Sequence, residues 1–152
     1  MHNRINAVAR LVKSVGDKAL VFGWVEMPFA EACDWCGVSD FMMMMIDEPD
    51  LAHLILGFIT SIEIEFALGQ IDAGAQIIGC GDAAASLISA PFFREFALPY
   101  EKRVTEAIRM AGCMTKLHMC GNSSHILLDL GTNGADLYNV DHMVDFDLAI
   151  CY

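Results

Sequence analysis

Three segments of the chain repeat one plan, and this plan constrains the fold more than any other feature. In each segment a helical stretch stops at a glycine, a short apolar run follows, and a polar residue stands eight positions after the glycine. The three glycines are Gly74, Gly112 and Gly134. The three polar residues are Asp82, Cys120 and His142. Glycine commonly follows the last turn of a helix, and a short apolar run bounded by such signals is typical of a strand. The repeat therefore predicts strands over residues 76–82, 114–120 and 136–142, each preceded by a helix.

The remaining elements extend this alternation. A fourth strand is expected over residues 19–26, and acids around Pro49 are typical of a helix start. Helices are expected over residues 29–35, 51–71 and 91–109 and from Asn122 or Ser123 to Leu130. Polar residues at the carboxyl ends of successive parallel strands favour a (β/α)₈ TIM barrel. A doubly wound sheet is less favoured, because Gly79-Cys80-Gly81 lacks the third glycine of a phosphate-binding loop.

The number of strands is too small for a closed barrel. Only about four strands fit in 152 residues, against the roughly eight that closure requires. We therefore expect an α/β fold in which residues 1–152 form a single, incomplete barrel domain of about four β/α units.

Charge and composition exclude several classes of protein. The chain has 9 Lys and Arg against 20 Asp and Glu, and no basic residue between residues 19 and 93. A nucleic-acid groove needs a basic stripe, so no nucleic acid is expected as a partner. Apolar residues make up 55% of the chain, but the run at residues 51–62 is too short to span a membrane. Six cysteines without a visible signal peptide predict reduced thiols and a cytoplasmic protein.

His118 and Cys120 are the residues that most directly suggest chemistry. They are two apart, so on a strand they point to the same face, and Gly121-Asn122 ends that strand. An imidazole and a thiol at a strand tip form half of a tetrahedral zinc site. The alternative, a satisfied histidine beside a packed thiol, has about equal weight on spacing alone. Asp82, at the tip of the neighbouring strand, is the candidate catalytic group, and a cap or turn residue is its alternative. Glu26 and Asp141, at the other tips, are weaker candidates.

The other cysteines and the run of methionines are expected to have a structural role and no catalytic one. Cys33 and Cys36 have redox or zinc spacing, but they lie within an expected helix and no second such pair accompanies them. Residues 42–45 are four consecutive methionines, which would cover every face of a helix and so indicate a core or a buried interface. Packed thiols are expected at Cys80, Cys113 and Cys151.

Three blocks of the sequence resemble a known family. They are residues 81–89 (Gly-Asp-Ala-Ala-Ala-Ser-Leu-Ile-Ser), residues 92–103 (from Phe-Phe-Arg-Glu-Phe to Pro-Tyr-Glu-Lys-Arg), and residues 117–122 (Leu-His-Met-Cys-Gly-Asn). The blocks resemble the uroporphyrinogen decarboxylase superfamily, and most closely its cobamide-dependent methyltransferase branch. The resemblance implies a (β/α)₈ barrel of roughly twice this length. It also implies a zinc ion held by the His-x-Cys pair, here His118 and Cys120, and by a distant cysteine. In that branch the metal-bound thiol of a substrate attacks the methyl group of a corrinoid carried by a partner protein.

The resemblance leaves three functions to compare. The first is a zinc-dependent methyltransferase that moves a methyl group from a methyl-corrinoid protein to a small thiol such as coenzyme M or homocysteine, or to a pterin-type acceptor. The second is uroporphyrinogen decarboxylation in porphyrin biosynthesis, and the third is a non-catalytic truncated barrel. The third zinc ligand of the family would lie beyond Tyr152, and Cys151 is not expected to replace it. The decarboxylase's essential arginine and aspartate would precede this chain. We therefore expect the full-length protein to be an enzyme and this segment alone to be inactive.

Overall fold

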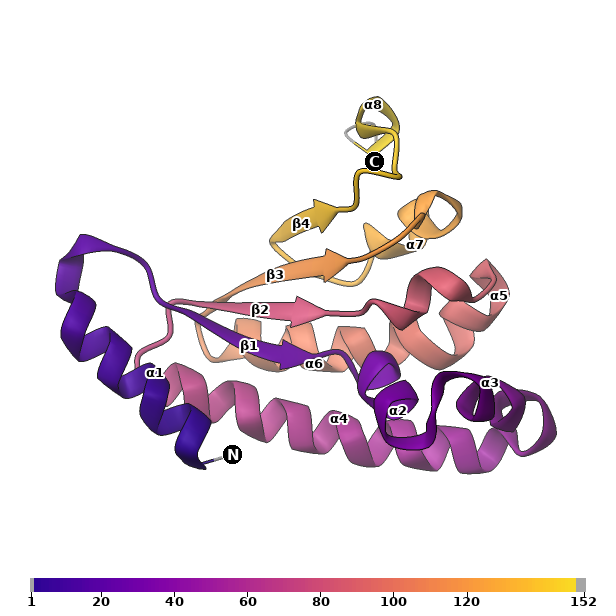
Figure 1. Ribbon diagram of the computed structural model, residues 1–152, viewed down its shortest axis with the longest axis horizontal. Helices are drawn as coiled ribbons and strands as arrows, with labels where there is room; N and C mark the ends of the chain where they lie inside the picture. The colour runs from indigo at the N-terminus through magenta and orange to yellow at the C-terminus, as the bar shows by residue number, and fades with distance from the viewer. Residues whose placement is uncertain (1, 150–152) are drawn as a thin grey trace.

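The computed structural model describes residues 2–149 and contains one sheet of four parallel strands (Figure 1). The strands are β1 (Phe22–Glu26), β2 (Ile77–Gly81), β3 (Met114–Met119) and β4 (Leu137–Val140). They lie in the order β1-β2-β3-β4, so that every strand pairs with its neighbour in sequence. This topology confirms the predicted α/β class and the four β/α units. Each strand is shorter than its predicted run, and residues 19–21 before β1 are not part of the sheet.

Helices connect the strands and mostly follow the predicted positions. They are α1 (His2–Val15), α2 (Pro28–Cys36), α3 (Val38–Asp47), α4 (Pro49–Asp72), α5 (Ala90–Phe92), α6 (Leu98–Met110), α7 (Leu127–Leu130) and α8 (Phe146–Ala149). The expected single helix over residues 91–109 is instead divided into α5, a π-helical turn at residues 93–97, and α6. Pro99 explains the division, because its missing N–H and its ring disrupt the preceding helical turn.

Helix α4 forms the floor of the core. It packs against α2, α3, α6 and β1, and it buries Leu56, Ile59 and Phe66. Among residues 2–149 it is the one helix whose length and composition would allow it to cross a membrane. It packs on four other elements, and 39% of its most apolar window is buried.

The two faces of the sheet differ. Helices α4 and α6 run along one face, where Val25, Ile78 and Leu117 are buried (Figure 1). The opposite face, here called the open face, exposes four large apolar side chains: Phe22, Trp24, Met114 and Leu137. Strand pairing places these four in two adjacent rows across the sheet. A closed barrel encloses such a face, so the structure is consistent with a partial barrel.

Candidate functional site

The tip of β3 brings the predicted zinc ligands together. His118 Nε2 lies 3.1 Å from Cys120 Sγ, and His118 Nδ1 lies 3.1 Å from the carbonyl oxygen of Asn139 on β4. A carbonyl oxygen can only accept, so Nδ1 carries the proton and donates it to Asn139. In the neutral imidazole, Nε2 is then left with its lone pair directed at the thiol. Histidines that bind metals commonly donate their other ring N–H to a backbone carbonyl in this way.

The turn after β3 fixes the position of Cys120. Gly121 has a φ of 80°, which favours glycine, and a Cβ at this position would lie 2.8 Å from Ser86 Oγ. The backbone N–H of Gly121 donates to Oδ2 of Asp141, at a distance of 3.0 Å. Bonds to Gly121 and Met143 hold the pKa of Asp141 below its ordinary value. Asp141, at the end of β4, therefore anchors the turn that carries the thiol.

On the open face beside this tip, β2 contributes glycines between the side chains of β1 and β3. Glu26, Gly81 and His118 are aligned across β1, β2 and β3, so their side-chain positions share the open face. Gly81 has no side chain there, and a Cβ would lie 2.5 Å from Glu26 Oε2. One row earlier, the ring of Trp24 lies over Gly79, next to Lys116. The two glycines leave room for the Trp24 ring and the Glu26 carboxylate, which lie over β2 beside the imidazole and the thiol. Burial raises the pKa of Glu26, which makes its carboxylate a stronger base than that of an exposed glutamate.

Asp82 lies next to His118 through its backbone but not through its side chain. Its N–H donates to the carbonyl oxygen of His118 at 3.0 Å, whereas its carboxyl group has 0% exposure. Gly81 shares the open face with His118, so Asp82, the next residue, faces the helices. The structure therefore brings Asp82 to the predicted site without presenting its carboxyl group to the open face. Its catalytic role stays a prediction.

The partner of Asp82 is Glu101 of α6, which is also fully buried. Within residues 2–149 the oxygens of Asp82 and Oε1 of Glu101 have no hydrogen bond of good geometry, although the backbone N–H of Ala85 lies near the Asp82 carboxyl group. Two adjacent buried carboxyl groups are best satisfied when they hold a proton between them, and burial raises the pKa of both. Glu101 Oε2 accepts a bond of 2.9 Å from Asn133 Nδ2, and Tyr138 donates to Asn133 Oδ1 at 2.6 Å. This polar chain links β2, α6 and β4 within the helix layer.

The sequence carries a signal that Glu101 is buried. Leu98, Glu101, Val104, Thr105 and Ile108 follow helical spacing and are all buried. That stripe places Glu101 on the core side of α6, although the neighbouring Lys102 and Arg103 suggest a solvent-exposed surface. The contact between His118 and Asn139 involves a backbone carbonyl, and residue identity carries no signal for it.

The other cysteines behave as packed thiols within the described residues. Cys33, Cys80 and Cys113 are buried, and burial raises the pKa of Cys33 to about 12. Thiols of this kind are poor nucleophiles and poor metal ligands. Cys36, at the end of α2, is half-buried and no partner thiol is bonded to it. Cys151 lies outside the described residues. The methionine run is only partly buried, because Met45 is in the core but Met43 is 54% exposed.

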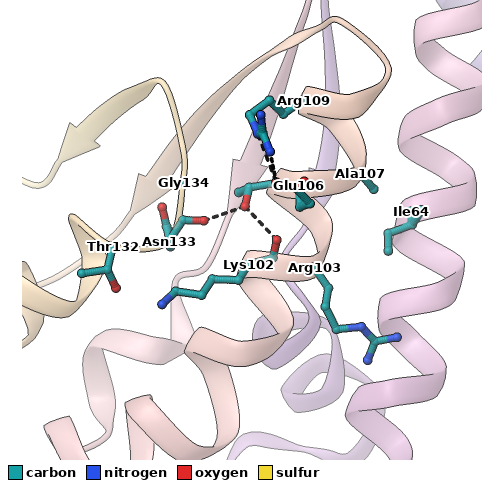
Figure 2. Close-up of a pocket in the computed structure, with 10 residues that line it drawn as sticks. Ile64, Lys102, Arg103, Glu106, Ala107, Arg109, Thr132, Asn133 and Gly134 are labelled. Atoms are coloured by element: carbon teal, nitrogen blue, oxygen red, sulfur yellow. Dashed lines mark hydrogen bonds and ion pairs between the residues drawn. The ribbon is translucent and has the colours of Figure 1, made fainter.

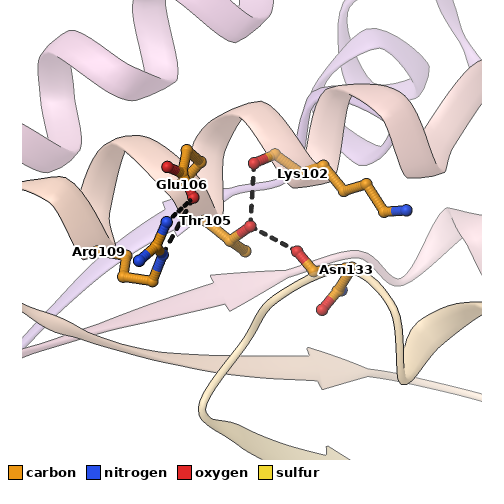
Figure 3. A network of polar contacts seen from close by, with 5 residues as sticks. All are labelled: Lys102, Thr105, Glu106, Arg109 and Asn133. Carbon is orange, nitrogen blue, oxygen red and sulfur yellow. Dashed lines mark hydrogen bonds and ion pairs between the residues drawn. The ribbon is translucent and has the colours of Figure 1, made fainter.

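A wider groove of about 690 Å³ lies on the outer side of α6, against the loop at residues 132–134 (Figure 2). Its wall is held by Thr105, whose hydroxyl donates to the carbonyl oxygens of Asn133 and Lys102 (Figure 3). Glu106 pairs with Arg109 on the same helix. None of the predicted site residues lines this groove. The Thr105 bonds join α6 to the loop and are structural.

The tip of β3 fits half of a zinc site. Zinc binds nitrogen at about 2.0–2.1 Å and sulfur at about 2.3 Å, so two ligands of one tetrahedral ion are roughly 3.5 Å apart. The observed 3.1 Å between Nε2 and Sγ needs only a small expansion to reach this value. Among residues 2–149 no third histidine, cysteine, aspartate or glutamate lies close enough to complete the site. The donor pair therefore suits zinc, with further ligands to come from elsewhere.

Known proteins match most of this chain. A model of the family described as uroporphyrinogen decarboxylase (URO-D) matches residues 1–150. Uroporphyrinogen decarboxylase of Gloeobacter violaceus is 33% identical over 142 residues, which cover 89% of this chain and 41% of that enzyme. The methylcobamide:CoM methyltransferase MtbA of Methanosarcina mazei is 31% identical over 147 residues, covering 95% of this chain and 43% of the enzyme.

A solved structure is also similar to this chain. A methyltransferase from Methanosarcina mazei superposes with a TM-score of 0.82 at 28% identity, covering 89% of this chain and 40% of that one. The chain thus spans about two fifths of the length of the relatives it matches. A family match that extends over residues 1–150 supports one conclusion, which the resemblance in sequence anticipated: the chain belongs to the uroporphyrinogen decarboxylase family.

Proposed function

We propose that this chain is part of a zinc-dependent methyltransferase that moves a methyl group from a methyl-corrinoid protein to a small thiol. The observation that carries the proposal is the geometry of His118, whose Nδ1–H is bonded to Asn139 so that Nε2 faces the Cys120 thiol. Similarity to the methylcobamide:CoM methyltransferase MtbA supports it. A zinc ion bound here would act as a Lewis acid that keeps a coordinated thiol ionised near neutral pH.

The residues of this chain would divide the work by position. His118 and Cys120 would hold the metal, and Asn139 would keep the imidazole in the correct tautomer. Gly79 and Gly81 would let Trp24 and Glu26 lie against β2 next to the metal. Glu26, with a raised pKa, is suited to accept the substrate's thiol proton. Asp82 would support the tip from the helix side, through its backbone bond to His118.

The whole protein would need more than this chain contains. A third protein ligand for zinc would come from outside residues 1–152, and the corrinoid would be carried by a separate protein partner. We place the protein in the cytoplasm, where reduced thiols persist.

Uroporphyrinogen decarboxylation is the second candidate, because the Gloeobacter violaceus enzyme is 33% identical to this chain. A substrate with many carboxylates calls for arginine and lysine around its pocket. Lys116 is the one basic residue that the described strands place on the open face. This charge distribution favours the methyltransferase.

Zinc content tests the proposal most directly. In the complete protein that contains this chain, we expect one zinc per chain by elemental analysis, and its loss in His118→Ala and in Cys120→Ala. Cys113→Ala, which removes a buried thiol from the same strand region, should keep the metal. A folded wild-type protein without zinc, or one that keeps zinc in both ligand variants, would contradict the proposal and direct the work to a porphyrinogen decarboxylation assay.

A further inference from the structure

Two backbone groups from neighbouring strands hold His118, one on each side of β3. On the β2 side, the carbonyl oxygen of His118 accepts the N–H of Asp82. On the β4 side, Nδ1–H of the ring donates to the carbonyl oxygen of Asn139. The second bond sets the tautomer and the direction of the ring, and its acceptor is a backbone atom. The orientation of His118 therefore depends on what fixes the backbone of β4 at Asn139.

Asn133, in the loop before β4, is a rigid anchor for this strand. The backbone N–H of Ala135 donates to Asn133 Oδ1 at 3.0 Å, and an N–H can only donate, so this amide has one orientation. Its Nδ2 then donates to Glu101 Oε2 at 2.9 Å. The hydroxyl of Thr105, on α6, donates to the Asn133 carbonyl oxygen at 2.6 Å (Figure 3). Asn133 is buried, with an exposure of 1%, and is held from α6 and from its own loop.

Tyr138 connects this anchor to β4. Its hydroxyl lies 2.6 Å from Asn133 Oδ1 and 2.9 Å from the carbonyl oxygen of Leu130, at the end of α7. A hydroxyl has one proton, so the two acceptors share it and the ring is tied to the loop and to α7 together. Tyr138 is paired with the buried Leu117 of β3, so its ring lies on the helix side of the sheet. Asn139 is the next residue along the strand.

We propose that Tyr138, anchored on Asn133, is a positioning residue for the proposed metal ligand His118. Tyr138 acts through the backbone of β4, which places the Asn139 carbonyl oxygen 3.1 Å from His118 Nδ1. That bond keeps the proton on Nδ1 and leaves Nε2 for a metal. The inference rests on the zinc site of the proposed function, but the tautomer of His118 can be measured without any metal.

A purely structural role for the Tyr138 hydroxyl leads to a different expectation. Its loss would then lower the free energy of unfolding and leave the His118 ring unchanged. Tyr100 provides a matched control, because its hydroxyl lies 2.8 Å from His53 Nδ1 and joins α6 to α4 instead of β4. Tyr138→Phe and Tyr100→Phe each remove one hydroxyl group and keep the aromatic ring. Tyr138 is 41% exposed, so the Phe variant is expected to fold.

Nitrogen NMR of the metal-free complete protein, labelled with ¹⁵N-histidine, measures the tautomer directly. The spectra are recorded at a pH at which histidines are neutral, and His118→Ala identifies the resonances of His118. We expect the Nδ1–H tautomer in the wild type and in Tyr100→Phe. Tyr138→Phe should shift the ring toward a mixture with the Nε2–H tautomer, because the Asn139 carbonyl oxygen is less well placed. Wild-type nitrogen shifts in Tyr138→Phe would overturn the proposal.

Zinc affinity gives the second readout, by competition with a chelator of known affinity. Loss of a group that directly orients a metal ligand commonly costs about tenfold or more in affinity, so Tyr138→Phe, one step further out, should raise the Kd about fivefold. Tyr100→Phe should leave the Kd unchanged. An unchanged Kd in Tyr138→Phe would also overturn the proposal, whatever happens to the free energy of unfolding.

The two measurements separate this inference from the proposed function. If the wild type binds zinc through His118 but Tyr138→Phe keeps both the tautomer and the Kd, the role of Tyr138 is refuted and the proposed function stands. If the wild type binds no zinc, the proposed function fails, and the nitrogen shifts of the metal-free protein alone decide whether Tyr138 positions the ring.

Discussion

His118 and Asp82 are hydrogen-bonded neighbours through their backbones, yet their side chains lie in opposite environments. His118 and Cys120 face the open side of the sheet, where Nε2 and Sγ lie 3.1 Å apart and are not enclosed by the core. Asp82 faces the helix layer, where it is sealed against Glu101. Asp82 is one residue beyond Gly81, the residue that pairs with His118, and this single residue puts its side chain on the opposite face of the sheet. The comparison teaches that a polar residue at a strand tip serves chemistry or packing according to the face that the register assigns to it.

The largest expected effect tests the helix side of this comparison. Glu101→Ala should lower the free energy of unfolding by about 3 kcal/mol, because the buried Asp82 carboxyl group and the buried Nδ2 donor of Asn133 both lose their side-chain partner. Urea unfolding followed by circular dichroism measures it. Glu106→Ala, on the exposed side of the same helix, should hardly move the unfolding midpoint. If both variants lowered the free energy of unfolding equally, the buried Asp82–Glu101 pair would contribute no more to stability than an exposed ion pair.

The pH dependence of stability sharpens the same point. The fold raises the pKa values of Asp82 and Glu101 from ordinary values of 3.8 and 4.5. Well below pH 3.8 both groups are protonated whether the chain is folded or unfolded, so the pair then carries no penalty. As the pH rises above this range the unfolded chain releases protons that the native state retains, so stability from this pair falls.

Glu101→Gln removes one of the two ionisable groups and keeps a donor for Asp82 and an acceptor for Asn133. The variant should match the wild type at about pH 3 and exceed its free energy of unfolding at pH 8, because only the wild type then carries two coupled buried carboxyl groups. Urea titrations at the two pH values measure the difference. An advantage that is the same at both pH values would show that the pair does not hold a proton.

The difference between the two faces also explains which parts of the fold and the site the sequence predicts and which it does not. The glycine-to-tip repeat predicted three of the four parallel strands, and the apolar run over residues 19–26 predicted the fourth. The spacing of His118 and Cys120 predicted their common face. Asp82 shares the same repeat, but its face depends on whether β2 ends at Gly81 or one residue later. Sequence spacing alone does not determine this register.

The smallest expected effect concerns the open side and the residue that anchors its turn. Asp141→Ala should weaken zinc binding about tenfold in the complete protein, because the Gly121 N–H loses its acceptor and Cys120 becomes less well positioned. Competition with a chelator of known affinity measures this change. Lys116→Ala, on the same face of β3 but away from the turn, should leave zinc affinity as it is. Asp141→Asn retains an acceptor oxygen and should recover most of the affinity. If Asn behaves like Ala, the carboxylate acts through its charge and not as the acceptor of the Gly121 N–H.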